Sequence, residues 1–279
     1  MDNKHINFVK KIEYRTCPDI LVGNDKEFWF SKKERIKHKN ELNIFDSLKT
    51  RKKDELIIVI ILESPHISEF STKREGFARI LSSKREDDFF DDKILANPAL
   101  GKTGNNLQKY FTHNNLNNLI EKSIHDLHKY KKYKVILMNS IQYQCSLGCN
   151  PKKYRDHNWI QYWFSQGKEE FLERLQIYNP DIIFNLCTKG NHQDENNNAF
   201  FKKNNCKTVI NGKYINYCVG KKVSLTTKNT TIRQIVSNYI IENIDTISYN
   251  KGIYLFEGNH PSSWYKNDFN SIKLIYFPK

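Results

Sequence analysis

Residues 56–66 read LIIVIILESPH, an unbroken apolar run that ends in a carboxylate and a proline. A run of this length is too short to cross a bilayer and is typical of a strand buried on both faces of a sheet. Apolar runs at 134–138, 181–186 and 252–257 predict three more strands of this kind. Polar or small residues follow each run, so the sequence predicts a sheet with polar groups at its strand ends.

Helical patterns fill the intervals between these strands. The helix predicted at 167–178 has its apolar side chains on one face and is expected to end before Pro180, because proline disfavours helical geometry in the residue before it. Alternating strands and helices predict a mostly parallel sheet with helices on both faces. The other predicted helices are 103–111, 115–129 and 230–242.

One domain is expected to account for most of the chain. Residues 1–55 are charged and helix-prone, and we expect a helical extension or cap there, followed by the main domain over 56–279. The stretch 190–229 is rich in Asn and Lys without strong periodicity. We interpret it as an insertion in the main domain and not as a second domain.

The chain of 279 residues is strongly basic, with 45 Lys and Arg against 31 Asp and Glu, a formal net charge of +14. Such a surplus attracts polyanions, although a lysine-rich solubilising surface has the same composition, so charge alone leaves nucleic-acid binding open. The first residues contain no apolar signal segment, and no apolar run reaches the length of a membrane span. We therefore expect a cytoplasmic protein without a membrane partner.

Six cysteines raise the question of a metal site. Only Cys145 and Cys149 lie close together in the sequence, and no second tight pair follows them. A structural zinc site needs four converging ligands, so reduced thiols without a bound metal are expected.

Glu63 directly follows the first predicted strand. An ionised carboxylate there is costly to bury unless it is hydrogen-bonded or used in chemistry, and it is suited to orienting or deprotonating a water molecule. A solvated glutamate at a strand end is the alternative. Pro65 stiffens the turn that follows and restricts Ser64 to extended geometry.

Two further segments carry groups suited to nucleotides. Asn139 follows the second predicted strand, and its amide can read the edge of a base or merely cap a turn. Gly101 and Gly104 allow close approach of a backbone, and a helix that begins near Thr103 would offer N–H groups to a phosphate. A tight start of a helix without any ligand fits the two glycines equally well.

The segment Asn259-His260-Pro261-Ser262-Ser263 follows the last predicted strand. An imidazole at His260 could donate a hydrogen bond to a leaving group, and Ser262 and Ser263 are suited to holding phosphate oxygens. Trp264 could wedge into a base stack or could instead cover the core. Because polar groups at strand ends line the crevice where open α/β sheets bind ligands, Glu63 and His260 are expected to face one pocket.

Taken in this order, the segments resemble the uracil-DNA glycosylase superfamily, above all family 4 and related bacterial branches, over roughly residues 56–275. The resemblance lies in short motifs and in the long helix that ends at Pro180. The matching segments are Leu62-Glu63-Ser64-Pro65-His66, residues 97–107, Met138-Asn139-Ser140 and His260-Pro261-Ser262.

The resemblance implies a three-layer α/β/α sandwich that flips a nucleotide out of double-stranded DNA and hydrolyses its N-glycosidic bond, leaving an abasic site, without a metal or other cofactor. Glu63 would handle the attacking water or the cationic sugar, Asn139 would bind the base, and His260 would stabilise the departing base. The substrate-binding residues that it implies are Ser64, Pro65, His66, Ala99, Gly101, Lys102, Gly104, Asn105, Ser262, Ser263 and Trp264.

The departures from the family pattern concern the walls of the pocket. Ala99 stands where the family has an aromatic residue that stacks on uracil, and base stacking of this kind is worth about 1–3 kcal/mol. The stretches 67–96 and 190–252 are longer than their family counterparts. Cys17 is alone near the N-terminus and Gln161 replaces a cysteine, so the family's iron–sulfur cluster is not expected.

These departures predict a pocket for a bulky modified base, such as glucosylated hydroxymethylcytosine in phage DNA, whose excision would serve antiviral defence. Repair of uracil or another deaminated base is the first alternative. A catalytically silent DNA-binding module on the same fold is the second. A hydrolase of free nucleosides is the third, and the charge of +14 argues against it.

Overall fold

The apolar run that opens the main domain forms β3 (Glu55–Leu62), the central strand of a seven-stranded sheet, and all eight of its residues are buried. This computed structural model describes sixteen stretches of the chain. They are residues 17–38, 44–49, 51–65, 69, 98–99, 101–124, 127, 132–143, 145, 159–160, 162–189, 207–210, 213–216, 231–248, 252–265 and 268–278.

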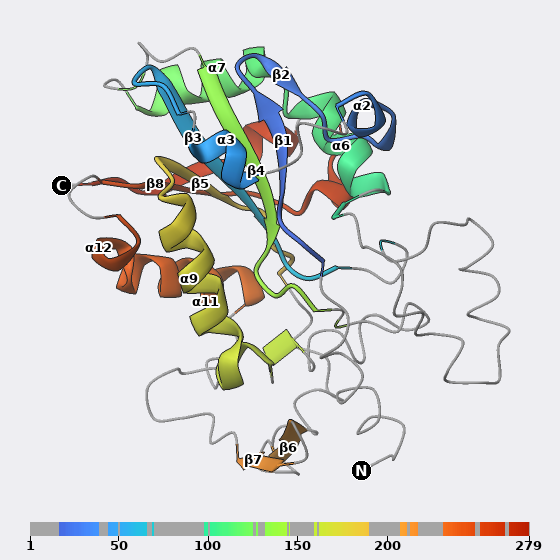
Figure 1. Ribbon diagram of the computed structural model, residues 1–279, viewed down its shortest axis with the longest axis vertical. Helices are drawn as coiled ribbons and strands as arrows, with labels where there is room; N and C mark the ends of the chain where they lie inside the picture. The colour runs from blue at the N-terminus through green and yellow to red at the C-terminus, as the bar shows by residue number, and fades with distance from the viewer. Residues whose placement is uncertain are drawn as a thin grey trace, which may run out of the picture.

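The four predicted strands are the parallel centre of this sheet (Figure 1). β3 pairs in parallel with β4 (Lys132–Asn139) on one side and with β5 (Ile182–Asn185) on the other, and β5 pairs in parallel with β8 (Tyr254–Glu257). The flanking strands are antiparallel to their neighbours. The full order is β2-β1-β4-β3-β5-β8-β9, with β2 at Glu27–Phe28, β1 at Ile20–Asn24 and β9 at Lys273–Tyr276.

The sheet separates two hydrophobic cores, and β3 contributes to both. Leu56, Ile58, Ile60 and Leu62 belong to one core, whereas Ile57, Val59 and Ile61 belong to the other. Successive side chains of a strand point to opposite faces, so a strand with a core on each face must be apolar at every position. This explains the unbroken apolar run in the sequence.

Helices contribute to each core, which confirms a mixed α/β fold. α6 (Lys102–Tyr110) and α7 (His113–Ser123) supply Leu107 and Leu116 to the core of the even-numbered β3 residues. α9 (Lys168–Tyr178) and α11 (Ile232–Glu242) supply Leu175 and Val236 to the other core. In Figure 1 the first pair of helices and the second pair lie on opposite sides of the sheet.

The helix ends follow local chemistry. The side chain of Thr112 caps α7, which begins at His113, two residues before the predicted start, and ends at Ser123 instead of 129. α9 continues a π-helical turn, Trp163–Gly167, and ends with Asn179 in the left-handed region at φ 45°. The short elements are α2 (Lys32–Lys37), α3 (Ile44–Lys49), α12 (Ile244–Ile247), η5 (Pro261–Ser263), η6 (Asp268–Ser271) and the hairpin of β6 (Lys207–Ile210) with β7 (Lys213–Asn216).

The prediction of a separate helical extension over 1–55 is wrong for its described part. Residues 20–28 form β1 and β2, which extend the main sheet beyond β4, and α2 and α3 follow them. β1 forms because β4 offers a free edge to the short apolar run Ile20-Leu21-Val22. Residues 1–16 lie outside the described part, as do most of 67–96 and a large part of 190–252.

None of the helices described here is both long enough and apolar enough to cross a membrane.

Candidate functional site

Polar side chains gather where the parallel strands end, along one edge of the sheet. Leu62 and Asn139 are register partners, so Glu63 lies one residue beyond the level of Asn139 on the neighbouring strand. The chain runs from β3 to β4 on one side and returns to β5 on the other. Open α/β sheets bind ligands at such a switch point, outside the carboxyl ends of the strands.

The carboxylate of Glu63 lies inside the protein, and the residue is 2% exposed. The hydroxyl of Thr188, in the segment after β5, donates a hydrogen bond to its Oε2 atom. Beside them, burial and then the charge of Glu63 raise the pKa of the Cys187 thiol well above its usual range, so this sulfur stays protonated. The carboxylate is therefore oriented by a hydroxyl and next to a neutral thiol.

The backbone of Glu63 is attached to the loop that follows β4. Its carbonyl oxygen accepts hydrogen bonds from Ile141 N at 3.1 Å, from Ser140 Oγ at 2.5 Å and from Trp159 Nε1 at 3.2 Å. Ser140 N also donates to the carbonyl of Leu62 at 2.7 Å. The turn that carries the carboxylate is thus held by three side chains or amides from outside its own strand.

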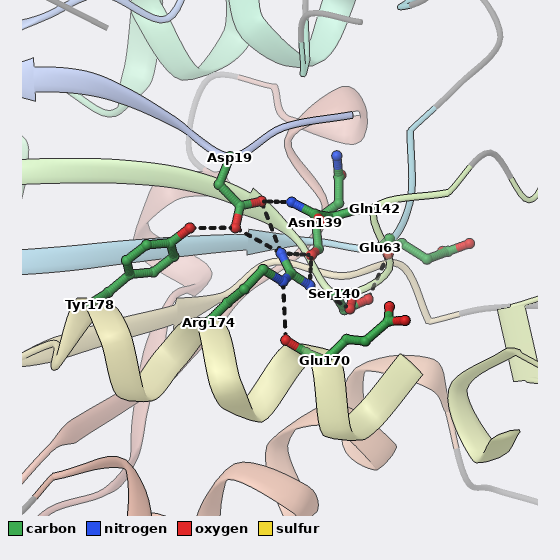
Figure 2. A network of polar contacts seen from close by, with 8 residues as sticks. All are labelled: Asp19, Glu63, Asn139, Ser140, Gln142, Glu170, Arg174 and Tyr178. Carbon is green, nitrogen blue, oxygen red and sulfur yellow. Dashed lines mark hydrogen bonds and ion pairs between the residues drawn. The ribbon is translucent and has the colours of Figure 1, made fainter. Parts of the chain in front are cut away.

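Asn139 is also 2% exposed, and its Nδ2 atom has no hydrogen-bond partner among the described residues. In Figure 2 its amide points away from Arg174, which holds the main chain of the same residue. An unsatisfied buried donor costs about 1–3 kcal/mol. A bound ligand that offered a carbonyl oxygen or a ring nitrogen would satisfy it.

His260 lies at the same edge, three residues beyond the end of β8, and caps η5. Its Nδ1 atom accepts a hydrogen bond from Ser262 N at 3.3 Å and lies 2.8 Å from Ser262 Oγ. A neutral imidazole whose Nδ1 accepts carries its proton on Nε2. The Nε2–H group of His260 is therefore the donor of this ring.

Arg233, in the first turn of α11, connects the segments after β5 and β8. Its Nε donates to the carbonyl of Cys187 at 2.9 Å, and its Nη1 lies 3.5 Å from Asn259 Oδ1. Burial lowers the pKa of this guanidinium from its usual value. The side chain thereby ties the loop that contains His260 to the segment that follows β5.

The two glycines of residues 97–107 have different surroundings. Gly104 is packed closely against neighbouring backbone, and Gly101 is not. A Cβ atom at Gly104 would overlap the carbonyl oxygen of Ala99 and lie 2.8 Å from that of Phe30. The first turn of α6 can therefore pack this closely on Ala99 only because residue 104 is glycine. Among the residues that the structure describes, a Cβ atom at Gly101, the N-cap of α6, would meet nothing within 4 Å. Only Gly101 thus has the open surroundings that a ligand requires.

Ala99 has φ 56°, in the left-handed region, and is buried in the core beneath α6. A non-glycine residue in this region is strained by about 1–2 kcal/mol. Its neighbour Pro98 accepts a hydrogen bond from the buried Arg35 of α2. Of the other predicted substrate-binding residues, Lys102, Asn105 and Ser263 are exposed, Ser64 and Ser262 are half-buried, and Pro65 is buried, while His66 lies outside the described residues.

The hypothesis that Trp264 wedges into DNA is corrected by its position. Trp264 is 2% exposed, belongs to the core, and donates its Nε1–H to the carbonyl of Asn259 at 2.7 Å. Its ring makes T-shaped contacts with the rings of Tyr110 and Phe269. The exposed ring is that of Tyr265, which is 70% exposed and has the ammonium of Lys102 5.6 Å from its centroid.

Within the described part of the chain, no three His, Cys, Asp or Glu side chains gather as they would around a metal ion. Cys17, Cys145 and Cys187 are buried free thiols.

Comparison with known proteins gives no relative: no family model, curated protein or solved structure matches the chain.

Proposed function

We propose that the protein is a DNA glycosylase with a three-layer α/β/α fold that flips out a base and hydrolyses its N-glycosidic bond. The observation that carries this proposal is the buried carboxylate of Glu63 at the switch point of the sheet. Asn139 ends the neighbouring strand one residue short of the level of Glu63, and His260 follows β8 at the same edge. The two cores on opposite faces of the sheet support the proposed layers.

The chemistry assigned to each side chain follows from its surroundings. Glu63, oriented by Thr188, would hold the attacking water and take its proton while the water oxygen bonds to the C1′ atom of the sugar. The C1′–N bond breaks and its electron pair leaves with the base. The Nε2–H of His260 would stabilise the negative charge on that base, and Asn139 Nδ2 would hold the base in the pocket.

DNA is the proposed partner because the surface groups near the site suit a phosphate backbone. Lys102 and Ser263 are exposed at the junction of α6 and η5, where Asn106 Nδ2 donates to the carbonyl of Pro261 at 2.7 Å. The net charge of +14 of the whole chain also favours the binding of polyanions. Tyr265 is exposed beside Lys102, and we assign the role of a wedge between bases to this ring.

The proposed substrate is a bulky modified base, such as glucosylated hydroxymethylcytosine in phage DNA, and the proposed role is antiviral defence in the cytoplasm. What supports this choice is the sequence resemblance: Ala99 stands where glycosylases of the resembled family stack a ring on uracil, although its methyl lies in the core beneath α6. Without an aromatic ring at this position the protein lacks a stacking contact of about 1–3 kcal/mol that would favour a flat, unmodified base.

Base release from three matched duplexes tests the function. One would contain only ordinary cytosine, one a single uracil, and one glucosylated hydroxymethylcytosine, with abasic sites revealed by alkaline strand scission. We expect scission of the glucosylated duplex alone. Scission of the uracil duplex alone would refute the bulky substrate and assign the protein to repair, and no scission despite tight binding would identify a non-catalytic module.

A further inference from the structure

Arg174, in the middle of α9, makes contacts that reach from the helix to the loop after β4 (Figure 2). Its Nε donates to the carbonyl of Glu170 at 3.3 Å within the helix. Its Nη1 and Nη2 both donate to the carbonyl oxygen of Asn139 at 3.0 Å, and Nη2 also donates to that of Ser140 at 3.1 Å. Its Nη1 also donates to the carboxylate of Asp19. A guanidinium has five N–H donors, and this set of acceptors engages all of them.

Asp19 anchors the guanidinium from the segment just before β1. Its side chain is 1% exposed and accepts from Arg174 at 2.8 and 2.9 Å, from the hydroxyl of Tyr178 at 2.8 Å and from Gln142 Nε2 at 3.3 Å. Burial and then the charge of Asp19 raise the pKa of Tyr178 well above its usual range, so this hydroxyl remains a donor. A buried carboxylate with this many donors is firmly placed.

These contacts determine which way the end of β4 faces. The carbonyl of Asn139 points to Arg174, and its side-chain amide points away from it (Figure 2). The next residue, Ser140, places its hydroxyl on the carbonyl of Glu63 at 2.5 Å. Arg174 thus fixes the orientation of the proposed base-binding amide directly and touches the turn of the proposed catalytic carboxylate through Ser140.

We infer that Arg174 is a positioning residue for base recognition and that Asp19, in the segment outside the glycosylase-like region, is its anchor. The inference rests on the proposed function. Lysine is a poor substitute for Arg174, because its three donors sit on one nitrogen, whereas the five donors of the guanidinium are spread over three nitrogens that each have an acceptor. A misplacement of about 1 Å at a reacting group lowers rates on the order of 100-fold.

Kinetics of Arg174→Lys and Arg174→Ala test the inference, with Arg51→Ala as the matched control. Arg51 pairs with Asp181 at 2.8 Å at the opposite edge of the sheet, where Asp181 also accepts from Ile57 N. We expect both Arg174 variants to lower kcat for base release by roughly 10- to 100-fold with an unchanged Kd for DNA. Arg51→Ala should lower Tm and leave kcat unchanged. Full kcat in Arg174→Lys would overturn the inference.

Hydrogen exchange provides a readout that does not depend on activity. The amides of Ser140 and Ile141 bond to the carbonyls of Leu62 and Glu63, and Arg174→Ala should speed their exchange while leaving the amides inside β3 unchanged. Equal exchange rates in the variant and the wild type would overturn the inference even if activity falls. A wild type that releases no base would instead refute the proposed function, while exchange still decides whether Arg174 holds this loop.

Discussion

The hydroxyl of Thr188 donates a hydrogen bond to the carboxylate of Glu63, although the two residues lie 125 positions apart. Glu63 follows β3 and Thr188 follows the neighbouring parallel strand β5. The bond therefore crosses the switch point of the sheet and fixes the direction of the one buried carboxylate that the proposed reaction uses.

Replacing this hydroxyl tests its role in orienting the carboxylate. Thr188→Val keeps the shape of the side chain but removes the donor, so we expect kcat for base release to fall roughly 10-fold, as for the loss of a hydrogen bond to a charged group. Thr188→Ser keeps the donor and should retain most of the activity. Equal loss in both variants, measured in single-turnover assays, would show that packing and not the hydrogen bond matters.

The two glycines near α6 should respond oppositely to alanine. Gly104→Ala forces a methyl against the backbone of Ala99 and Phe30, and we expect the free energy of unfolding to fall by about 1–3 kcal/mol. Gly101→Ala meets open space, so its cost should stay below about 1 kcal/mol. Denaturant unfolding measures both. If the surroundings of Gly101 accommodate DNA, Gly101→Ala should also raise the Kd for duplex DNA, and an unchanged Kd would exclude that contact.

Asn139→Ala should separate stability from function. The variant removes a buried amide whose Nδ2 is unsatisfied among the described residues, so the free energy of unfolding should rise by about 1 kcal/mol. The same change should lower kcat/KM for base release by 10-fold or more, in line with the loss of a 1–3 kcal/mol hydrogen bond. A strongly destabilised variant, seen in denaturant unfolding, would mean that the amide supports the fold instead of a ligand.

Alkaline pH should destabilise the protein through its buried phenols. Burial, and then the charge of Glu121, raises the pKa of Tyr133 from 10.0 to about 12. Between these values the unfolded chain has lost this proton and the folded protein has kept it, so the free energy of unfolding should fall as pH rises. Denaturant unfolding from pH 9 to pH 12 measures the slope. Tyr133→Phe should make it shallower, and an unchanged slope would contradict the assignment.

The centre of the fold could be predicted because each of its strands is a short apolar run with a clear end. β1 could not, because Ile20-Leu21-Val22 lies in a charged segment and becomes a strand only through the free edge of β4. Whether Trp264 is buried could not be predicted for a similar reason. A Pro-Ser-Ser-Trp sequence does not show that the next turn brings the indole onto Tyr110 and Phe269.

The site was predicted in part. Glu63, Asn139 and His260 follow predicted strands, and the parallel pairing brings their strand ends to one edge. Thr188 and Arg174 were missed because their partners are 125 and 35 positions away, and such distant polar pairs leave no periodicity or spacing in a sequence. A polar residue just after the third predicted strand was the only available signal for Thr188.

The most direct test of the central claim is single-turnover base release by Glu63→Gln, measured beside DNA binding by fluorescence anisotropy. Glu55→Gln is the matched control, since Glu55 is an equally buried carboxylate at the other end of β3, paired with Lys134 at 3.7 Å. We predict that Glu63→Gln lowers the rate of base release by about 100-fold or more with an unchanged Kd, and that Glu55→Gln leaves the rate intact. Wild-type rates in Glu63→Gln would contradict the account.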